Sequence, residues 1–163
     1  GQTVPEFGYR VMTSPLTFYD CSRGGTLSTR YPANYCDIWP KHFAKLNAAC
    51  HAAACPAEDM RPLHRAELQV FAEGVADIMR RDPSPTQRLK GYKAEAALRS
   101  PWLRALLERM KIEHCYSAYY LPCRWRNVGL VCRVDEARRT NAPLYGKLDW
   151  AGYYLLLGKM KRD

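Results

Sequence analysis

The side chains of this chain that are best suited to chemistry gather in residues 36–64. This stretch holds three of the seven cysteines and three of the four histidines, namely Cys36, Cys50, Cys55, His42, His51 and His64. Thiolate and imidazole groups can ligate zinc, and a thiolate beside a base can act as a nucleophile. The stretch therefore raises the questions of metal binding, disulfide formation and cysteine catalysis.

Zinc is considered first, because Cys50-His51-x3-Cys55 places soft ligands close together. A structural zinc ion needs four ligands, usually supplied as two close pairs. The other close pair is His114-Cys115, and adjacent residues rarely share one metal. We therefore expect no metal site and no cofactor. A disulfide between Cys50 and Cys55, a disulfide between Cys36 and Cys50, and buried free thiols that pack as small apolar groups all remain open.

Cysteine catalysis has a separate candidate in Cys21. The run Asp20-Cys21-Ser22 resembles the nucleophile segment of small papain-like peptidoglycan peptidases, and the resemblance implies a secreted cysteine hydrolase that uses Cys21. In that family the segment continues into a helix, whereas Arg23-Gly24-Gly25 follows here. No glycine-rich phosphate loop is present, because this run lacks the spacing and the lysine of a P-loop. We expect the chain not to be an enzyme.

A basic and aromatic run near residue 125 is the strongest candidate for binding a macromolecule. Arg124-Trp125-Arg126 places a tryptophan between two cations, and Tyr119 and Tyr120 lie just before it. The cations of such a set can bind phosphates, and its aromatic rings can stack on unpaired bases. Arginine, tryptophan and tyrosine are also the residues that dominate protein interfaces. We favour a protein contact surface formed by Arg124, Trp125, Arg126, Tyr119 and Tyr120.

The charge of the chain is unevenly placed. Residues 1–80 carry eight basic and eight acidic side chains, whereas residues 81–163 carry seventeen basic and eight acidic ones, so the net charge of +9 lies in the second half. A field of that sign suits an acidic subunit, an anionic lipid or RNA. A solvated basic face that keeps the protein soluble is the alternative.

The elements that must position these residues are mainly helical. Residues 1–35 are interrupted by proline and glycine and predict an extended irregular arm, followed by a single helical domain over residues 36–163. Apolar spacing and capping signals predict helices over residues 40–55, 62–81, 86–99, 101–114 and 150–161. The aromatic and β-branched residues of 115–134 predict a short β-hairpin. The longest apolar run, residues 150–157, is too short to cross a membrane, which takes about 20 residues.

One resemblance bears on the compartment. Arg30-Tyr31-Pro32 followed by Cys36, Trp39 and Cys50 is similar to the lead into the first helix of the twin-cysteine helical-hairpin proteins of the mitochondrial intermembrane space. Thirteen residues separate Cys36 from Cys50, where that family has about nine, and no matching second pair follows. The resemblance covers about thirty residues, and we assign no family on it.

The sequence therefore predicts a non-catalytic accessory subunit of a large multiprotein assembly. A mitochondrial respiratory-chain or ATP-synthase complex fits a cysteine-containing helical chain that does not itself span a membrane. Its partners would be other protein subunits. The basic half of the chain could also contact a membrane protein or an anionic lipid. An RNA-associated ribosomal protein is the alternative, and the secreted hydrolase is the third hypothesis.

Overall fold

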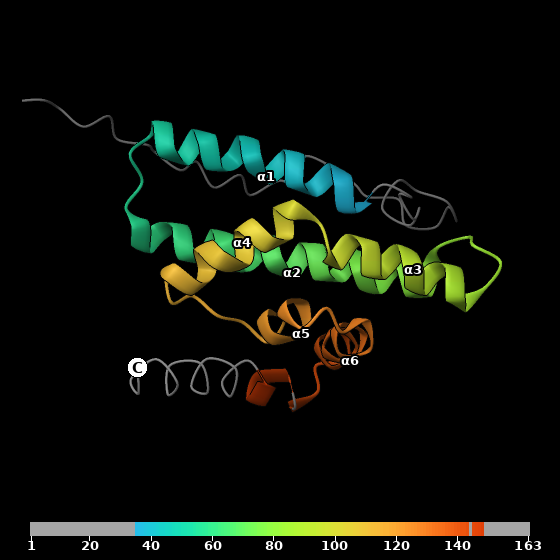
Figure 1. The fold of residues 1–163 in the computed structure, drawn as a ribbon. Coiled ribbons are helices and arrows are strands. Elements are labelled where there is room, and N and C mark those ends of the chain that lie inside the picture. The colour runs from blue at the N-terminus through green and yellow to red at the C-terminus, as the bar shows by residue number, and fades with distance from the viewer. Residues whose placement is uncertain (1–34, 144, 149–163) are drawn as a thin grey trace, which may run out of the picture. The chain divides into compact units, whose positions relative to one another are not determined.

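The computed structural model describes residues 35–143 and 145–148, which belong to one compact unit. The helices named in Figure 1 are α1 (Tyr35–Ala52), α2 (Ala57–Arg81), α3 (Gln87–Leu98), α4 (Pro101–Ile112), α5 (Tyr120–Arg124) and α6 (Val128–Arg139). The predicted mainly helical fold is confirmed for these residues. The predicted arm, apart from residue 35, and the predicted helix at 150–161 lie outside the described residues.

Helix α2 is the element on which the others pack. It contacts α1, α3, α4 and α6, whereas α5 packs between α4 and α6. Three of its side chains, Leu68, Phe71 and Val75, are at most 1% exposed. Their spacing of three and four residues places them on one face, where burial of each stabilises the fold by about 1.5–3 kcal/mol. The central position of α2 follows from this apolar face.

Three helices begin at side-chain caps. Thr86, Ser100 and Asn127 accept hydrogen bonds from the backbone N–H groups three residues later, at 3.2, 3.3 and 3.0 Å respectively. Such caps satisfy a donor that has no partner within the helix, and each is worth about 1 kcal/mol. The starts of α3 and α4 therefore agree with the predicted ranges to within one residue.

The first two helices begin earlier than the sequence predicts. Pro40 and Pro62 were expected at the first helical position, but each is the sixth residue of its helix. Proline lacks an N–H group, so each leaves one carbonyl of the first turn without its helical donor. The missing bond falls near the helix end, where it costs less than in the middle.

The predicted β-hairpin at residues 115–134 is wrong. This segment contains α5 and α6, and no strand occurs in the described residues. Tyr116, Tyr119, Tyr120 and Cys123 are buried at helical spacing, and Tyr116 meets Tyr120 edge-on with ring centroids 4.8 Å apart. Asn127, interpreted as part of a hairpin turn, is the N-cap of α6. Packing has overridden the strand preference of these aromatic and β-branched residues.

Four of the helices end in the same backbone turn. At the ends of α1, α4, α5 and α6, one residue with positive φ donates to the carbonyl three residues back, and the next residue donates to the carbonyl five residues back. This pattern is the Schellman motif, in which glycine is the usual residue at the positive-φ position. Here the positions hold Ala54 (φ 52°), His114 (φ 53°), Arg126 (φ 54°) and Asn141 (φ 48°).

None of the helices among the described residues combines the length and apolar character needed to cross a membrane.

Candidate functional site

The structure separates the cysteines and histidines of residues 36–64. Cys36 and Cys50 both lie within α1, fourteen residues apart along one continuous helix. At a rise of about 1.5 Å per residue their Cα atoms are about 21 Å apart, whereas a disulfide requires less than about 7 Å. The predicted alternative of a Cys36–Cys50 disulfide is therefore wrong. Cys50 and Cys55 remain neighbours, at the turn that ends α1.

Cys21 and its predicted role as a nucleophile lie outside the described residues. The histidines that could have served it as a base have different surroundings. His42 and His51 are exposed on α1, and His114 is exposed after α4. His64 is 2% exposed and takes part in a cluster that the sequence analysis did not find.

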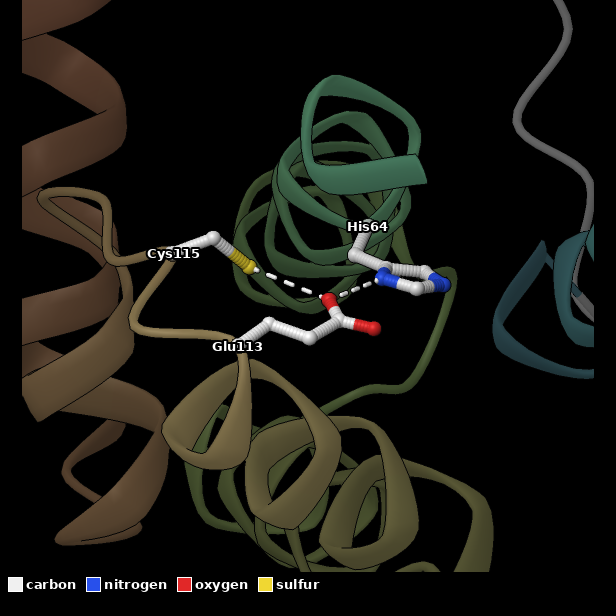
Figure 2. A group of neighbouring side chains, drawn as sticks. All are labelled: His64, Glu113 and Cys115. Atoms are coloured by element: carbon white, nitrogen blue, oxygen red, sulfur yellow. Dashed lines mark hydrogen bonds and ion pairs between the residues drawn. The ribbon is translucent and has the colours of Figure 1, made fainter. Parts of the chain in front are cut away.

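That cluster consists of His64 of α2 with Glu113 and Cys115, which follow α4. Figure 2 shows His64 and Cys115 directed at the same carboxylate oxygen, with His64 Nδ1 2.6 Å and Cys115 Sγ 3.5 Å from Glu113 Oε2. Arg109 Nη1 lies 3.5 Å from the other ring nitrogen of His64. These partners assign the proton of His64 to Nδ1, which donates to the carboxylate, while Nε2 accepts from Arg109.

The electrostatics of the cluster keep the thiol protonated. Burial and, after it, the neighbouring carboxylate of Glu113 together raise the pKa of Cys115 to about 12. A thiol with that pKa is almost entirely uncharged at neutral pH and donates its proton to Glu113. Since the thiolate is the nucleophilic form, Cys115 is not suited to covalent catalysis.

His64, Glu113 and Cys115 offer three ligand atoms within 4.8 Å of one another, and no other such group occurs among the residues described. Nitrogen, oxygen and sulfur are all zinc ligands, so the donor atoms of the cluster are of the types that a metal site uses. Two ligands of a tetrahedral zinc ion, each about 2.0–2.1 Å from it, lie about 3.3 Å apart. The 2.6 Å between His64 Nδ1 and Glu113 Oε2 is instead a hydrogen-bond distance. Arg109 would also place a positive charge beside the ion.

A structural role therefore accounts for the cluster. It joins the start of α2 to the end of α4 through groups whose donors and acceptors are matched. A second polar contact ties α1 to the same part of α2, because Asn47 Nδ2 donates to Glu67 Oε1 at 2.5 Å. Burial raises the pKa of Glu67, which is 2% exposed. Hydrogen bonding of such buried polar groups limits the cost of removing them from water.

The predicted basic and aromatic run forms an exposed surface. Trp125 is 64% exposed, and Arg124 and Arg126 beside it are exposed as well. These residues border a pocket of about 350 Å³ between the end of α3, one face of α4 and the end of α5. Its apolar lining consists of Leu98, Leu107 and Cys123, and its arginines are Arg99, Arg104, Arg124 and Arg126. We call Trp125 and these four arginines the basic-aromatic surface.

Two of the arginines of this surface have no acidic partner among the residues that the structure describes. Arg99 pairs with Glu95 at 3.1 Å and Arg124 pairs with Glu108 at 3.0 Å. Within the described part of the chain, Arg104 and Arg126 form no ion pair. Among the described residues, the pocket therefore has a basic rim, and the apolar side chains beneath it are almost fully buried.

Tyr119 and Tyr120 do not belong to the surface that the sequence predicts. They are 0% and 1% exposed, and their rings pack in the core. Tyr119 donates to Asp135 Oδ1 at 3.3 Å, and Tyr120 donates to the carbonyl oxygen of Leu107 at 3.3 Å. Their hydroxyl groups are thus satisfied inside the protein, which is why two tyrosines beside an exposed tryptophan can be fully buried.

No family model, curated protein or solved structure matches this chain.

Proposed function

We propose that this protein is a non-catalytic accessory subunit of a multiprotein assembly, attached to a partner protein through the basic-aromatic surface. The observation that carries the proposal is the exposure of Trp125 between two arginines at the rim of a pocket. Tryptophan and arginine are enriched among the residues that dominate binding free energies. Covering the exposed part of Trp125 would contribute about 2–4 kcal/mol.

The chemistry of the pocket favours an acidic partner segment that carries an apolar side chain. An apolar side chain can pack on the exposed ring of Trp125, and carboxylates fit Arg104 and Arg126, which form no ion pair within the described residues. Arginine binds a carboxylate through two parallel hydrogen bonds, so a protein segment satisfies both features at once. An RNA strand would use the same arginines and one face of Trp125, so the experiment must separate the two kinds of partner.

The assembly that best suits this chain is a mitochondrial respiratory-chain or ATP-synthase complex. The cysteine content and the helical fold support it, together with the basic second half of the chain. Contact with a membrane protein or anionic lipid of such a complex is part of the same proposal. A ribosomal, RNA-associated role is the alternative that the experiment must separate.

The test is the native size of the endogenous protein, extracted in mild detergent with and without nuclease. We expect it to migrate with a particle far larger than the 18.7 kDa of these 163 residues, and we expect the particle to survive nuclease. A monomer in both samples would contradict the proposal. Collapse of the particle with nuclease would replace it with the RNA-associated role.

The surface itself is tested by Trp125→Ala, with Tyr92→Ala as the matched control. Tyr92 is also exposed beside an arginine, but Arg88 already covers its ring, with the guanidinium carbon 5.5 Å from the ring centroid. Truncation of a central interface residue costs about 2 kcal/mol or more, which is about a thirtyfold loss of affinity. We expect Trp125→Ala to detach from the particle and Tyr92→Ala to remain. Retention of both variants would show that another surface holds the subunit.

A further inference from the structure

The turn that ends α1 brings two cysteines together. Cys55 N–H donates to the carbonyl oxygen of Cys50 at 3.0 Å, and Ala54 N–H donates to that of His51 at 3.0 Å. In a Schellman turn these bonds identify Cys50 and Cys55 as the two positions whose side chains meet across the turn. The backbone therefore fixes both residues in the arrangement in which their sulfurs can approach.

The two thiols interact with each other. Burial raises the pKa of the Cys50 thiol, and the charge and hydrogen bond of Cys55 raise it further. Both residues are only partly buried, so an oxidant in solution can reach them. The remaining cysteines of the described residues differ. Cys115 and Cys123 are buried, Cys36 lies near the other end of α1, and Cys132 lies on α6.

From this geometry we propose that Cys50 and Cys55 form a disulfide that closes the C-terminal turn of α1. The oxidant is a small-molecule or protein disulfide. The thiolate of one cysteine attacks a sulfur of the oxidant and displaces one thiolate, which leaves a mixed disulfide. The second cysteine then attacks the protein sulfur of that mixed disulfide and releases the other thiolate. The two protein thiols lose two protons and two electrons, and the oxidant is reduced to two thiols.

The bond fastens the connection between α1 and α2. Among the six named helices of the described residues, α1 makes its extensive contacts with α2 alone, and the short connection after Ala52 joins the two. The disulfide closes a loop of six residues and ties Cys55, next to the proline that precedes α2, to the last turns of α1. The proposal is independent of the basic-aromatic surface, which lies on α3, α4 and α5.

Mass spectrometry tests the bond directly. The purified full-length protein is incubated with oxidised glutathione, alkylated and digested with trypsin. Because Arg61 is followed by proline, the peptide of residues 46–65 contains Cys50 and Cys55 and no other cysteine. We expect this peptide to be lighter than its reduced form by two hydrogen atoms and to take up no alkyl group. Uptake of two alkyl groups, a retained glutathione adduct, or a link to another cysteine would overturn the proposal.

Thermal unfolding tests whether the bond acts on the fold. We expect the oxidised protein to unfold about 4–8 °C above the reduced protein, because the closed loop restricts the unfolded chain. Cys50→Ser should unfold at one temperature in both redox states. Cys132→Ser is the matched control, since it removes a partly buried cysteine on α6 and should keep the full difference. A difference that survives Cys50→Ser would assign the effect to another pair and overturn the proposal.

Discussion

Arg80 of α2 and Asp135 of α6 form an ion pair in which the carboxylate is fully buried. Arg80 Nη1 lies 2.5 Å from Asp135 Oδ2, and the Asp135 side chain is 0% exposed. The other carboxylate oxygen accepts from Tyr119 and lies 3.6 Å from Arg138 Nη2. Arg138 also pairs with Glu73 of α2 at 2.8 Å. This network joins the central helix to the last of the named helices.

Removing the carboxylate from this network should destabilise the fold strongly. We expect Asp135→Ala to lower the free energy of unfolding by about 3–5 kcal/mol, because two arginines and a buried tyrosine lose their common acceptor. The control is Glu95→Ala, which breaks the exposed Arg99–Glu95 pair and should cost at most about 0.5 kcal/mol. Urea unfolding measures the free energy of unfolding of both variants. Similar losses for the two would show that the buried ion pair stabilises the fold no more than an exposed pair does.

Glycine substitutions at two positive-φ positions should show whether Arg126 contributes to binding apart from its effect on stability. Arg126→Gly and His114→Gly each remove a side chain from the left-handed region, where it costs about 1–2 kcal/mol, and each adds the entropy cost of glycine, about 0.5–1 kcal/mol. We expect the free energy of unfolding to rise by up to about 1 kcal/mol in both variants. Only Arg126→Gly should weaken attachment to the partner, since His114 lies outside the pocket. Equal attachment of the two variants would remove Arg126 from the proposed contact.

Acid should destabilise the protein partly through Asp82. Hydrogen bonds from Ser84 and Lys93 hold the pKa of Asp82 at about 2, below the value of about 3.9 in an unfolded chain. The folded state therefore binds this proton less readily. The stabilisation is complete above about pH 3.9 and is lost as the pH falls towards about 2.

We expect Asp82→Asn to unfold at a lower temperature than the wild type at pH 6 and to lose less of its Tm between pH 4 and pH 2. Thermal unfolding across that range measures the difference. Parallel Tm curves for the two proteins would show that Asp82 does not contribute to the acid response.

Three thiols with raised pKa values should resist alkylation under reducing conditions. Burial raises the pKa values of Cys36, Cys115 and Cys123 to about 12. At pH 7.5 their thiolate fractions are about 10³-fold below that of a free cysteine, so native labelling should be slower by at least that factor. Timed iodoacetamide labelling with peptide mass spectrometry measures each rate, and urea should abolish the protection. Rapid labelling of Cys115 in the native protein would contradict the buried, protonated thiol.

The sequence predicts the parts of this fold that local signals determine. Ser100-Pro101 marks the start of α4, and Thr86 marks the start of α3. The hairpin prediction for the segment around Tyr119 and Tyr120 was wrong because strand preference is local. The packing that buries both tyrosines at the start of α5 involves distant parts of the chain. Periodicity can show that such tyrosines share a face. It cannot show whether that face meets the core or a partner.

The site could be predicted only where its residues are neighbours in sequence. Arg124, Trp125 and Arg126 were found as a contiguous run, whereas Arg104 joins them only through the packing of α4 against α5. His64 and Glu113 are 49 residues apart, and no spacing rule links them. Their pairing depends on how α2 and α4 are placed against each other.

The central position of α2 also has a consequence for synthesis. Its apolar face is complete once residue 81 has been made, but α4 and α6, which cover it, end only at residues 112 and 139. Synthesis of the roughly 60 residues between the end of α2 and the end of α6 takes about 3–12 s at 5–20 residues per second. Until α4 and then α6 are complete, the cover of Leu68, Phe71 and Val75 remains partial. The nascent chain is therefore most exposed to aggregation, and most in need of a chaperone, between the completion of α2 and the arrival of α6.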